Sequence, residues 1–451
     1  MKKFIETLKN IWSIEDLRKR IVYTLLLLVV YRLGCYIVLP GIEPNSLQME
    51  AQNSNGLLGL FNMFAGGAFN RASIFALGIM PYISASIAMQ LLQIAVPQFQ
   101  KLQKEESGRR KMNQYTRYLT VVVTLFQSFA YIAYLKRQSG GAIFLPDALF
   151  SISTVMVLTA GTLFVMWLGE KITDKGIGNG TSLLIMTGII ARFPHSVVQE
   201  FAAKNQGGGG LLIFLIEIAA FIAILIGIIM LIQGTRRVPV NYARKIMGGG
   251  NAAKQIGGVR QFIPLKVNSA GVMPIIFAQA IMFIPATIAG FSQNETATGI
   301  GRTFSDNTSF WYNLVYAVAV LVFTYFYTAL IFNPTQMADE MKRNNGFIPG
   351  IKPGQETANY IGAIMDRITL PGAIFLALIG ILPGIAALLK ITTGFASFFG
   401  GTSLLIMVGV ILDTLQQIES QLLMRHYDGL MKTGRITGRS SSSVSSVTTP
   451  V

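Results

Sequence analysis

Long apolar runs recur from one end of this chain to the other. Ten of them are long enough, or nearly so, to cross a bilayer, because a hydrocarbon core about 30 Å thick needs roughly 20 helical residues. They are residues 21–39, 72–96, 118–135, 148–168, 181–193, 211–232, 267–291, 311–332, 368–389 and 401–423. Hydrophobic residues make up 52% of the chain and charged residues 13%, which excludes an ordinary soluble domain. The sequence therefore predicts an all-α polytopic membrane protein with ten transmembrane helices.

Two of these runs need interpretation. The first follows a basic segment, as a secretory signal does, but it carries Arg32 and ends in VLPGIEPN without a small-residue cleavage site, so we interpret it as a retained span. The fifth meets Arg192 and Pro194 early, and we expect it to continue as an amphipathic helix through HSVVQEF before the glycine linker 207–210.

Basic residues are concentrated in alternate connections between the runs. The amino-terminal segment 1–20, the stretch after the second run and the connection 234–266 are rich in lysine and arginine, and 234–266 has no acid. The positive-inside rule then places both termini in the cytoplasm. Residues 424–451 form a cytoplasmic tail, which we expect to be disordered after about residue 438. The cytoplasmic loops 234–266 and 333–366 are far longer than turns require, which marks them as docking candidates.

Two short strings each occur twice, and in both cases the second copy lies five apolar runs after the first. GTSLLIM occupies 180–186 and 401–407, while GIMPYISA at 78–85 is matched by GVMPIIFA at 271–278. Run two therefore corresponds to run seven, and run five to run ten. Since each half holds an odd number of spans, the halves 21–205 and 211–423 must have opposite orientations, as in many membrane translocating proteins.

The duplicated strings carry equivalent isoleucines and prolines. Ile83 corresponds to Ile276 and Ile185 to Ile406, so that symmetry-related isoleucines could form a girdle around a central pathway; the alternative is ordinary helix packing or contact with lipid. Pro81 and its equivalent Pro274 remove backbone hydrogen bonds, and we expect them to bend their helices.

The duplicated positions favour a seal over a site that coordinates a solute or a metal. A ring of aliphatic side chains dewets and blocks ions, yet it yields to a chain that pushes through. One cysteine, two distant histidines and the absence of GxxxxGK[ST], HExxH and GxSxG motifs indicate no disulfide, cofactor or enzymatic site. The intramembrane acid Glu217 is interpreted as an end-of-helix or interhelical group. A secondary solute transporter with inverted repeats remains the alternative function.

Several strings of the chain resemble the SecY family of bacterial protein-conducting channels. They are FNMFAGGAFNRASIFALGIMPYISASI, ESGRRKMNQYTRY, MWLGEKITDKGIGNGTSLLI, RRVPVNYARK, FIPLKVNSAGVMP, FYTALIFNP and GGTSLLIM. The resemblance runs in order from about Trp12 to Gly434. It implies two inverted five-helix halves around an hourglass pore, through which unfolded polypeptide crosses the cytoplasmic membrane or leaves sideways into lipid.

The resemblance also implies roles for individual residues. A short plug helix is expected at about 56–70, and lateral exit between spans two and seven. The implied pore ring comprises Ile79, Ile83, Ile185, Ile276 and Ile406. The implied plug residues are Phe61, Asn62, Met63, Phe64, Gly66, Gly67 and Asn70. The implied lateral-gate residues are Ile87, Gln90, Asn268 and Gln279.

The partners implied by the resemblance supply the energy and the bracing that this chain lacks. They are the SecE and SecG subunits, the SecA motor, a translating ribosome, signal sequences and unfolded preproteins, the lipid bilayer, and accessory SecDF and YidC. The residues implied to dock cytoplasmic partners are Arg236, Arg237, Arg244, Lys245 and Lys352. Ribosomal RNA is polyanionic, which suits basic loops.

Overall fold

The structure is a computed structural model, and it describes most of the predicted spans. The described residues are 12, 14–43, 62–96, 98–99, 106–138, 143–205, 210–242, 260–279, 282 and 309–432. Several predictions lie outside them: the amino-terminal segment up to residue 11, the plug before residue 62 (including Phe61), Arg244 and Lys245, most of the second part of span seven, and the tail after residue 432.

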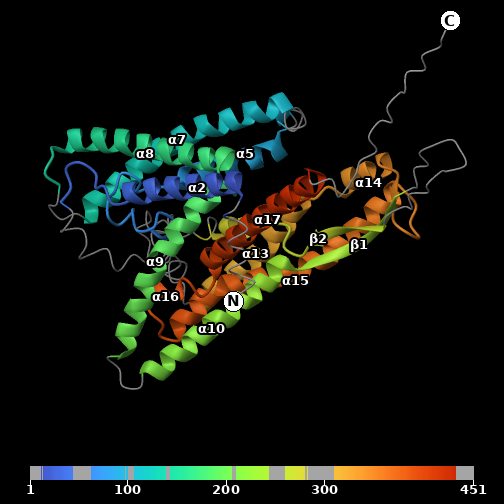
Figure 1. The fold of residues 1–451 in the computed structure, drawn as a ribbon. Coiled ribbons are helices and arrows are strands. Elements are labelled where there is room, and N and C mark those ends of the chain that lie inside the picture. Colours follow the sequence, from blue (N-terminus) through green and yellow to red (C-terminus); the bar gives the residue numbers. More distant parts are fainter. Residues whose placement is uncertain are drawn as a thin grey trace, which may run out of the picture.

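The helices form two groups that follow each other along the chain (Figure 1). The first group is α2 (Glu15–Gly34), α5 (Met80–Ala95), α7 (Glu106–Gln138), α8 (Asp147–Lys175) and α9 (Gly180–Asn205). The second is α10 (Gly210–Gln233), a helical segment at 273–279, α13 (Phe310–Ile331), α15 (Gln355–Leu388), the short α16 (Thr393–Ala396) and α17 (Gly401–Lys432). Helix α9 links the groups, because it packs against α2 and α8 on one side and α10, α16 and α17 on the other.

Seven of the described helices are long and apolar enough to cross a membrane. Helix α10 is the most apolar of them, and eight of its large apolar side chains are exposed, as expected of a helix that faces lipid. Helix α9 continues past Pro194 to Asn205, which confirms the predicted extension of the fifth span. The predicted total of ten spans stays a prediction, since α5 has 16 residues and the seventh span runs into residues outside the described part.

The second span starts later than its apolar run. Residues 65–79 form successive turns and bridges, and α5 begins only at Met80 with Pro81 in its first turn. Pro274 likewise lies at the start of the helical segment 273–279. The expectation that these prolines bend their helices is therefore wrong. Each proline lies in the first turn of its helix, where a backbone N–H would have no acceptor within the helix, so its lack of an N–H breaks no helical hydrogen bond. Gly78 (φ +53°) and Gly271 (φ +64°) precede the two starts, so the duplicated strings share a local structure.

Helices α9 and α17, which carry the two copies of GTSLLIM, pack against each other in antiparallel orientation. At the start of α9, the Gly178 N–H donates to Oε1 of Gln417 in the middle of α17, at 2.9 Å. Farther along α9, Gly188 contacts Phe64, whose neighbour Met63 contacts Ser403 near the start of α17. Opposite directions of the duplicated helices are what an inverted repeat requires.

The described parts of the two long loops that the sequence predicts to be cytoplasmic, residues 234–242 with 260–266 and residues 333–366, fold into one small unit. Strands β1 (Thr235–Tyr242) and β2 (Arg260–Lys266) are antiparallel, and β3 (Gly346–Phe347) adds to the other edge of β1 in the order β2-β1-β3. Helix α14 (Pro334–Arg343) and the first turns of α15 cover the sheet. Its separate core is Val238, Val240, Leu265, Met341, Ile348, Ile361 and Met365. The sequence analysis treated both segments as loops and missed this sheet, which we call the cytoplasmic sheet unit.

Candidate pore and gate

The structure brings four of the five ring isoleucines into one apolar cluster. Ile79, Ile185 and Ile406 are 3%, 8% and 7% exposed and belong to the same core, and the half-buried Ile83 packs against it. They come from the start of α5, from α9 and from α17. Ile276 is half-buried in the segment 273–279, whose neighbours Ile275 and Ala278 join the core. The role of all five as a pore ring stays a prediction.

The described part of the plug prediction, residues 62–70, lies against both duplicated helices. Ser403 of α17 donates its hydroxyl to the Met63 sulfur at 2.6 Å. On the other side, a Cβ atom on Gly188 of α9 would lie 2.4 Å from the Phe64 carbonyl oxygen and 3.1 Å from the Gly66 backbone nitrogen. Asn62, Met63 and Phe64 are buried.

The same segment is closed by internal hydrogen bonds. The Gly67 N–H donates to the Asn62 carbonyl oxygen at 2.8 Å, and the Asn70 N–H donates to the Asn62 Oδ1 at 3.2 Å. The Tyr131 hydroxyl, from α7, donates to the Phe69 carbonyl oxygen at 2.6 Å. The segment is therefore a compact turn structure held from several helices, with only a short helical stretch at 62–64.

The predicted lateral-gate residues lie where α5, residues 268–279 and α13 approach. The Tyr327 hydroxyl of α13 donates to Oε1 of Gln90 in α5 at 2.9 Å, which joins the two halves directly. The Phe277 ring lies 5.8 Å from Phe323 and 6.2 Å from Tyr327, between ring centroids. Ile87, Asn268 and Gln279 are half-buried. The sequence analysis missed Tyr327, because nothing local distinguishes it from the other tyrosines of its helix.

The predicted docking residues that are described lie on the cytoplasmic sheet unit. Arg236 and Arg237 are exposed on β1, opposite Leu265 and Pro264 of β2. Lys352 is exposed before α15, and its carbonyl oxygen accepts a hydrogen bond from Thr357 at 2.8 Å. Because β3 pairs with β1, the described parts of both long loops belong to one surface. The alternation of the buried Val238 and Val240 with the less buried Arg237, Pro239 and Asn241 is typical of a strand.

Glu217 forms an ion pair between two helices, which agrees with the interhelical role that was one of its two interpretations from the sequence. Its carboxylate in α10 lies 2.9 Å from the Lys204 ammonium at the end of α9. Lys204 also pairs with the buried Glu200 at 3.5 Å, and Glu200 accepts from the Thr392 N–H at 2.8 Å. These contacts join the α9–α10 connection to the segment before α16, away from the isoleucine cluster.

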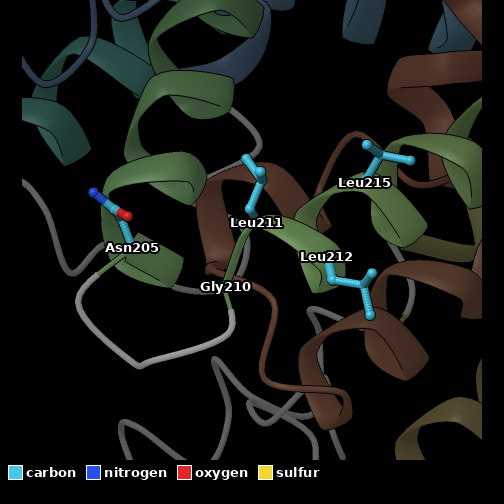
Figure 2. Close-up of a pocket in the computed structure, with 5 residues that line it drawn as sticks. All are labelled: Asn205, Gly210, Leu211, Leu212 and Leu215. Atoms are coloured by element: carbon cyan, nitrogen blue, oxygen red, sulfur yellow. The ribbon is translucent and has the colours of Figure 1, made fainter.

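The described residues offer little for a cofactor. No group of three or more metal-ligating side chains occurs among them. A hollow of about 450 Å³ lies between the end of α9 and the start of α10, lined by Asn205, Gly210, Leu211, Leu212 and Leu215 (Figure 2). One amide and three leucines give it no set of convergent polar groups for a specific ligand.

Comparison with known proteins gives one consistent result. A model of the SecY family matches residues 73–415. The protein translocase subunit SecY of Aquifex aeolicus is 41% identical over 434 residues, covering 95% of this chain and 99% of that protein. That of Thermotoga maritima is 39% identical over 445 residues, covering 96% and 99%.

Solved channel structures share the fold at low sequence identity. A protein-conducting channel superposes with a TM-score of 0.59 at 15% identity, covering 89% of this chain and 92% of that one. Sec61 in the canine ribosome–channel complex gives a TM-score of 0.56 at 15% identity, with the same coverage. A SecY structure with a plug domain that stabilises the closed channel gives 0.57 at 14% identity, covering 94% and 95%.

Proposed function

This chain belongs to the SecY family and has the role of a protein-conducting channel subunit, and we propose that unfolded polypeptide passes between its two halves, across the bacterial cytoplasmic membrane or sideways into lipid. One observation carries the proposal. The segment 62–67 lies between α9 and α17, the two helices with the duplicated string, and touches Gly188 on one and Ser403 on the other. A removable segment at the symmetry interface is what a resting channel needs.

The seal in this proposal has two layers. The isoleucines Ile79, Ile83, Ile185, Ile276 and Ile406 form an aliphatic constriction that excludes ions by dewetting. The segment 62–70 blocks the funnel beside it, as the plug domain of a related SecY does in maintaining a membrane seal. Aliphatic side chains suit a substrate of varied sequence, because they offer no specific hydrogen bond that would retain one segment over another.

Lateral release uses the junction of α5, residues 268–279 and α13. The contact between Gln90 and Tyr327 supports this place, because this one hydrogen bond joins the two halves there, while the Phe277 ring packs on Tyr327 within the second half. One hydrogen bond is small compared with a packed core, so a sufficiently apolar segment can replace it. Signal sequences would enter by the same route.

Motor or ribosome docking is assigned to the cytoplasmic sheet unit. Arg236, Arg237 and Lys352 present positive charge on a surface made rigid by three strands, which suits SecA or polyanionic ribosomal RNA. Arg244 and Lys245 belong to the same basic loop. SecE and SecG brace the channel, and SecDF and YidC assist it. Both termini are cytoplasmic, and the chain itself catalyses no reaction.

The test is transport by the purified protein. Proteoliposomes that contain this chain with SecE and SecG, supplied with SecA, ATP and a labelled precursor, should protect the precursor from external protease. Omission of ATP should abolish the protection. Ion-coupled uptake of a small solute, with no protected precursor, would instead identify a secondary transporter.

A further inference from the structure

Two arginines from different elements hold the turn at Gly66 and Gly67. Arg32 in α2 donates from Nη1 to the Gly66 carbonyl oxygen at 2.9 Å. Arg71 donates from Nη2 to the same oxygen at 3.1 Å and from Nε to the Gly67 carbonyl oxygen at 3.1 Å. Three charged hydrogen bonds thus converge on two carbonyl groups of one turn, and hydrogen bonds from charged donors are the stronger class.

The aromatic ring of Tyr36 contacts the guanidinium groups of both arginines. The Cζ atom of Arg71 lies 4.3 Å from the ring centroid, and that of Arg32 lies 5.0 Å from it. Arg32 also donates from Nη2 to the Tyr36 hydroxyl at 3.2 Å. Both guanidinium groups are therefore oriented by one ring as well as by the turn.

Within the described part of the chain, neither arginine forms an ion pair with a carboxylate. Arg117, by comparison, makes a bidentate pair with Glu170, at 2.9 and 2.8 Å. Cations in a membrane-embedded region are costly unless polar groups receive them. The carbonyl groups of the turn accept hydrogen bonds from both guanidinium groups, so the turn and the two arginines stabilise each other.

The turn can accept this contact only with glycine at both positions. Gly66 and Gly67 have φ values of +62° and +86°, which disfavour side chains. A Cβ atom on Gly66 would lie 2.7 Å from Nη1 of Arg32, and one on Gly67 would lie 2.6 Å from Nη2 of Arg71. The two glycines therefore serve the approach of the guanidinium groups as well as the backbone conformation.

We propose that Arg32, Arg71 and Tyr36 form a clasp that holds the segment 62–67 in its resting position and sets how easily it is displaced. The inference rests on the proposed function, in which that segment is the plug. Arg71 lies only four residues after the segment and can move with it, whereas Arg32 belongs to α2. The bond from Arg32 to Gly66 must therefore break when the segment leaves α9 and α17, so the clasp residues act as positioning residues for the plug.

The contact between Met63 and Ser403 offers a direct readout of plug position. A parent protein with Cys35→Ala, Met63→Cys and Ser403→Cys should form an oxidised cross-link, since the native side chains are 2.6 Å apart and Cys35 is then absent. Arg32→Lys keeps the charge but removes the forked donor. Tyr36→Leu changes no charge and removes the ring. Both changes should lower the cross-linking rate and raise resting ion flux, by roughly tenfold for Arg32→Lys.

The matched control is Arg117→Lys, which removes a forked guanidinium contact between α7 and α8. It should leave cross-linking and resting flux at parent values. Unchanged cross-linking and flux in both Arg32→Lys and Tyr36→Leu, in a parent that exports precursor, would overturn the clasp while the proposed function stands. A parent that forms the cross-link on oxidation but never transports precursor in its reduced, uncross-linked state would overturn the proposed function instead.

Discussion

The carbonyl oxygen of Phe64 lies 2.4 Å from the point that a Cβ atom on Gly188 would occupy. The segment 62–67 therefore rests directly on the backbone of α9, at the glycine that follows the first copy of GTSLLIM. The equivalent glycine after the second copy, Gly409, has no atom within 4 Å of its Cβ position. This asymmetry between the halves permits a clean comparison of one substitution at two related positions.

Gly188→Ala should displace the plug segment. Overpacking costs about 1–3 kcal/mol, which corresponds to roughly a 5- to 150-fold shift toward the displaced state. Resting ion flux through proteoliposomes and export of precursors with defective signals should both rise. Gly409→Ala should change neither, because its methyl group meets open space. Equal effects of the two substitutions would contradict a specific contact between the plug and α9.

Tyr327→Phe should ease lateral opening. It removes the hydroxyl that binds Gln90 but keeps the ring that packs on Phe277, so the fold is retained. A side-chain hydrogen bond in a membrane is worth about 0.6 kcal/mol on average, so a roughly threefold shift is expected. The measurement is membrane insertion of a series of segments of graded hydrophobicity. Tyr325→Phe, on the exposed face of the same helix, is the control, and an equal change with it would refute the gate contact.

Arg236→Glu combined with Arg237→Glu should slow docking of the motor. Charge reversal on a steering surface lowers association rates by roughly tenfold or more at low salt, and by less as salt screens the interaction. SecA binding kinetics and precursor transport both report it. The double change Arg110→Glu with Lys111→Glu alters net charge equally at the exposed start of α7. If that control slowed docking as much, net charge rather than the cytoplasmic sheet unit would be the cause.

Met341→Ala should loosen the cytoplasmic sheet unit without affecting the membrane core. Met341 is 6% exposed in the separate core of that unit, and such truncations cost about 2–5 kcal/mol. Hydrogen exchange of the β1 amides should accelerate, while that of α9 stays unchanged. Met230→Ala, at a position 71% exposed on α10, should have no such effect. Unchanged β1 protection in Met341→Ala would show that the loops fold separately.

The spans and the repeat could be predicted from the sequence, because an apolar run is a local pattern and a repeat is found by comparing the sequence with itself. Apolar runs locate both ends of α10 and α13 and the starts of α8 and α17 closely, and the repeat predicts the opposite directions of α9 and α17 without any structure. Pro81 and Pro274 were placed on the right segments but given the wrong effect. An apolar run shows what is buried, not where the helix begins, and a proline fits a first turn better than an interior.

The contacts that matter most for the site join residues far apart in sequence. Tyr327 binds Gln90, Ser403 binds Met63, and Phe347 of β3 pairs with Asn241 of β1. No periodicity in either segment specifies such a partner. The cytoplasmic sheet unit was missed for this reason, since β3 has only two residues and strands need their neighbours to be stable.

The most direct test of the central claim asks what a moving polypeptide touches. In a Cys35→Ala background, Ile406→Cys and Ile411→Cys place a thiol on opposite sides of α17, since Ile406 is 7% exposed and Ile411 is 42% exposed. A precursor stalled in proteoliposomes, with one cysteine in its translocating part, should form a disulfide with position 406 and not with position 411. Cross-linking at 411 alone, or equally at both, would contradict a path between the halves that is lined by the isoleucine cluster.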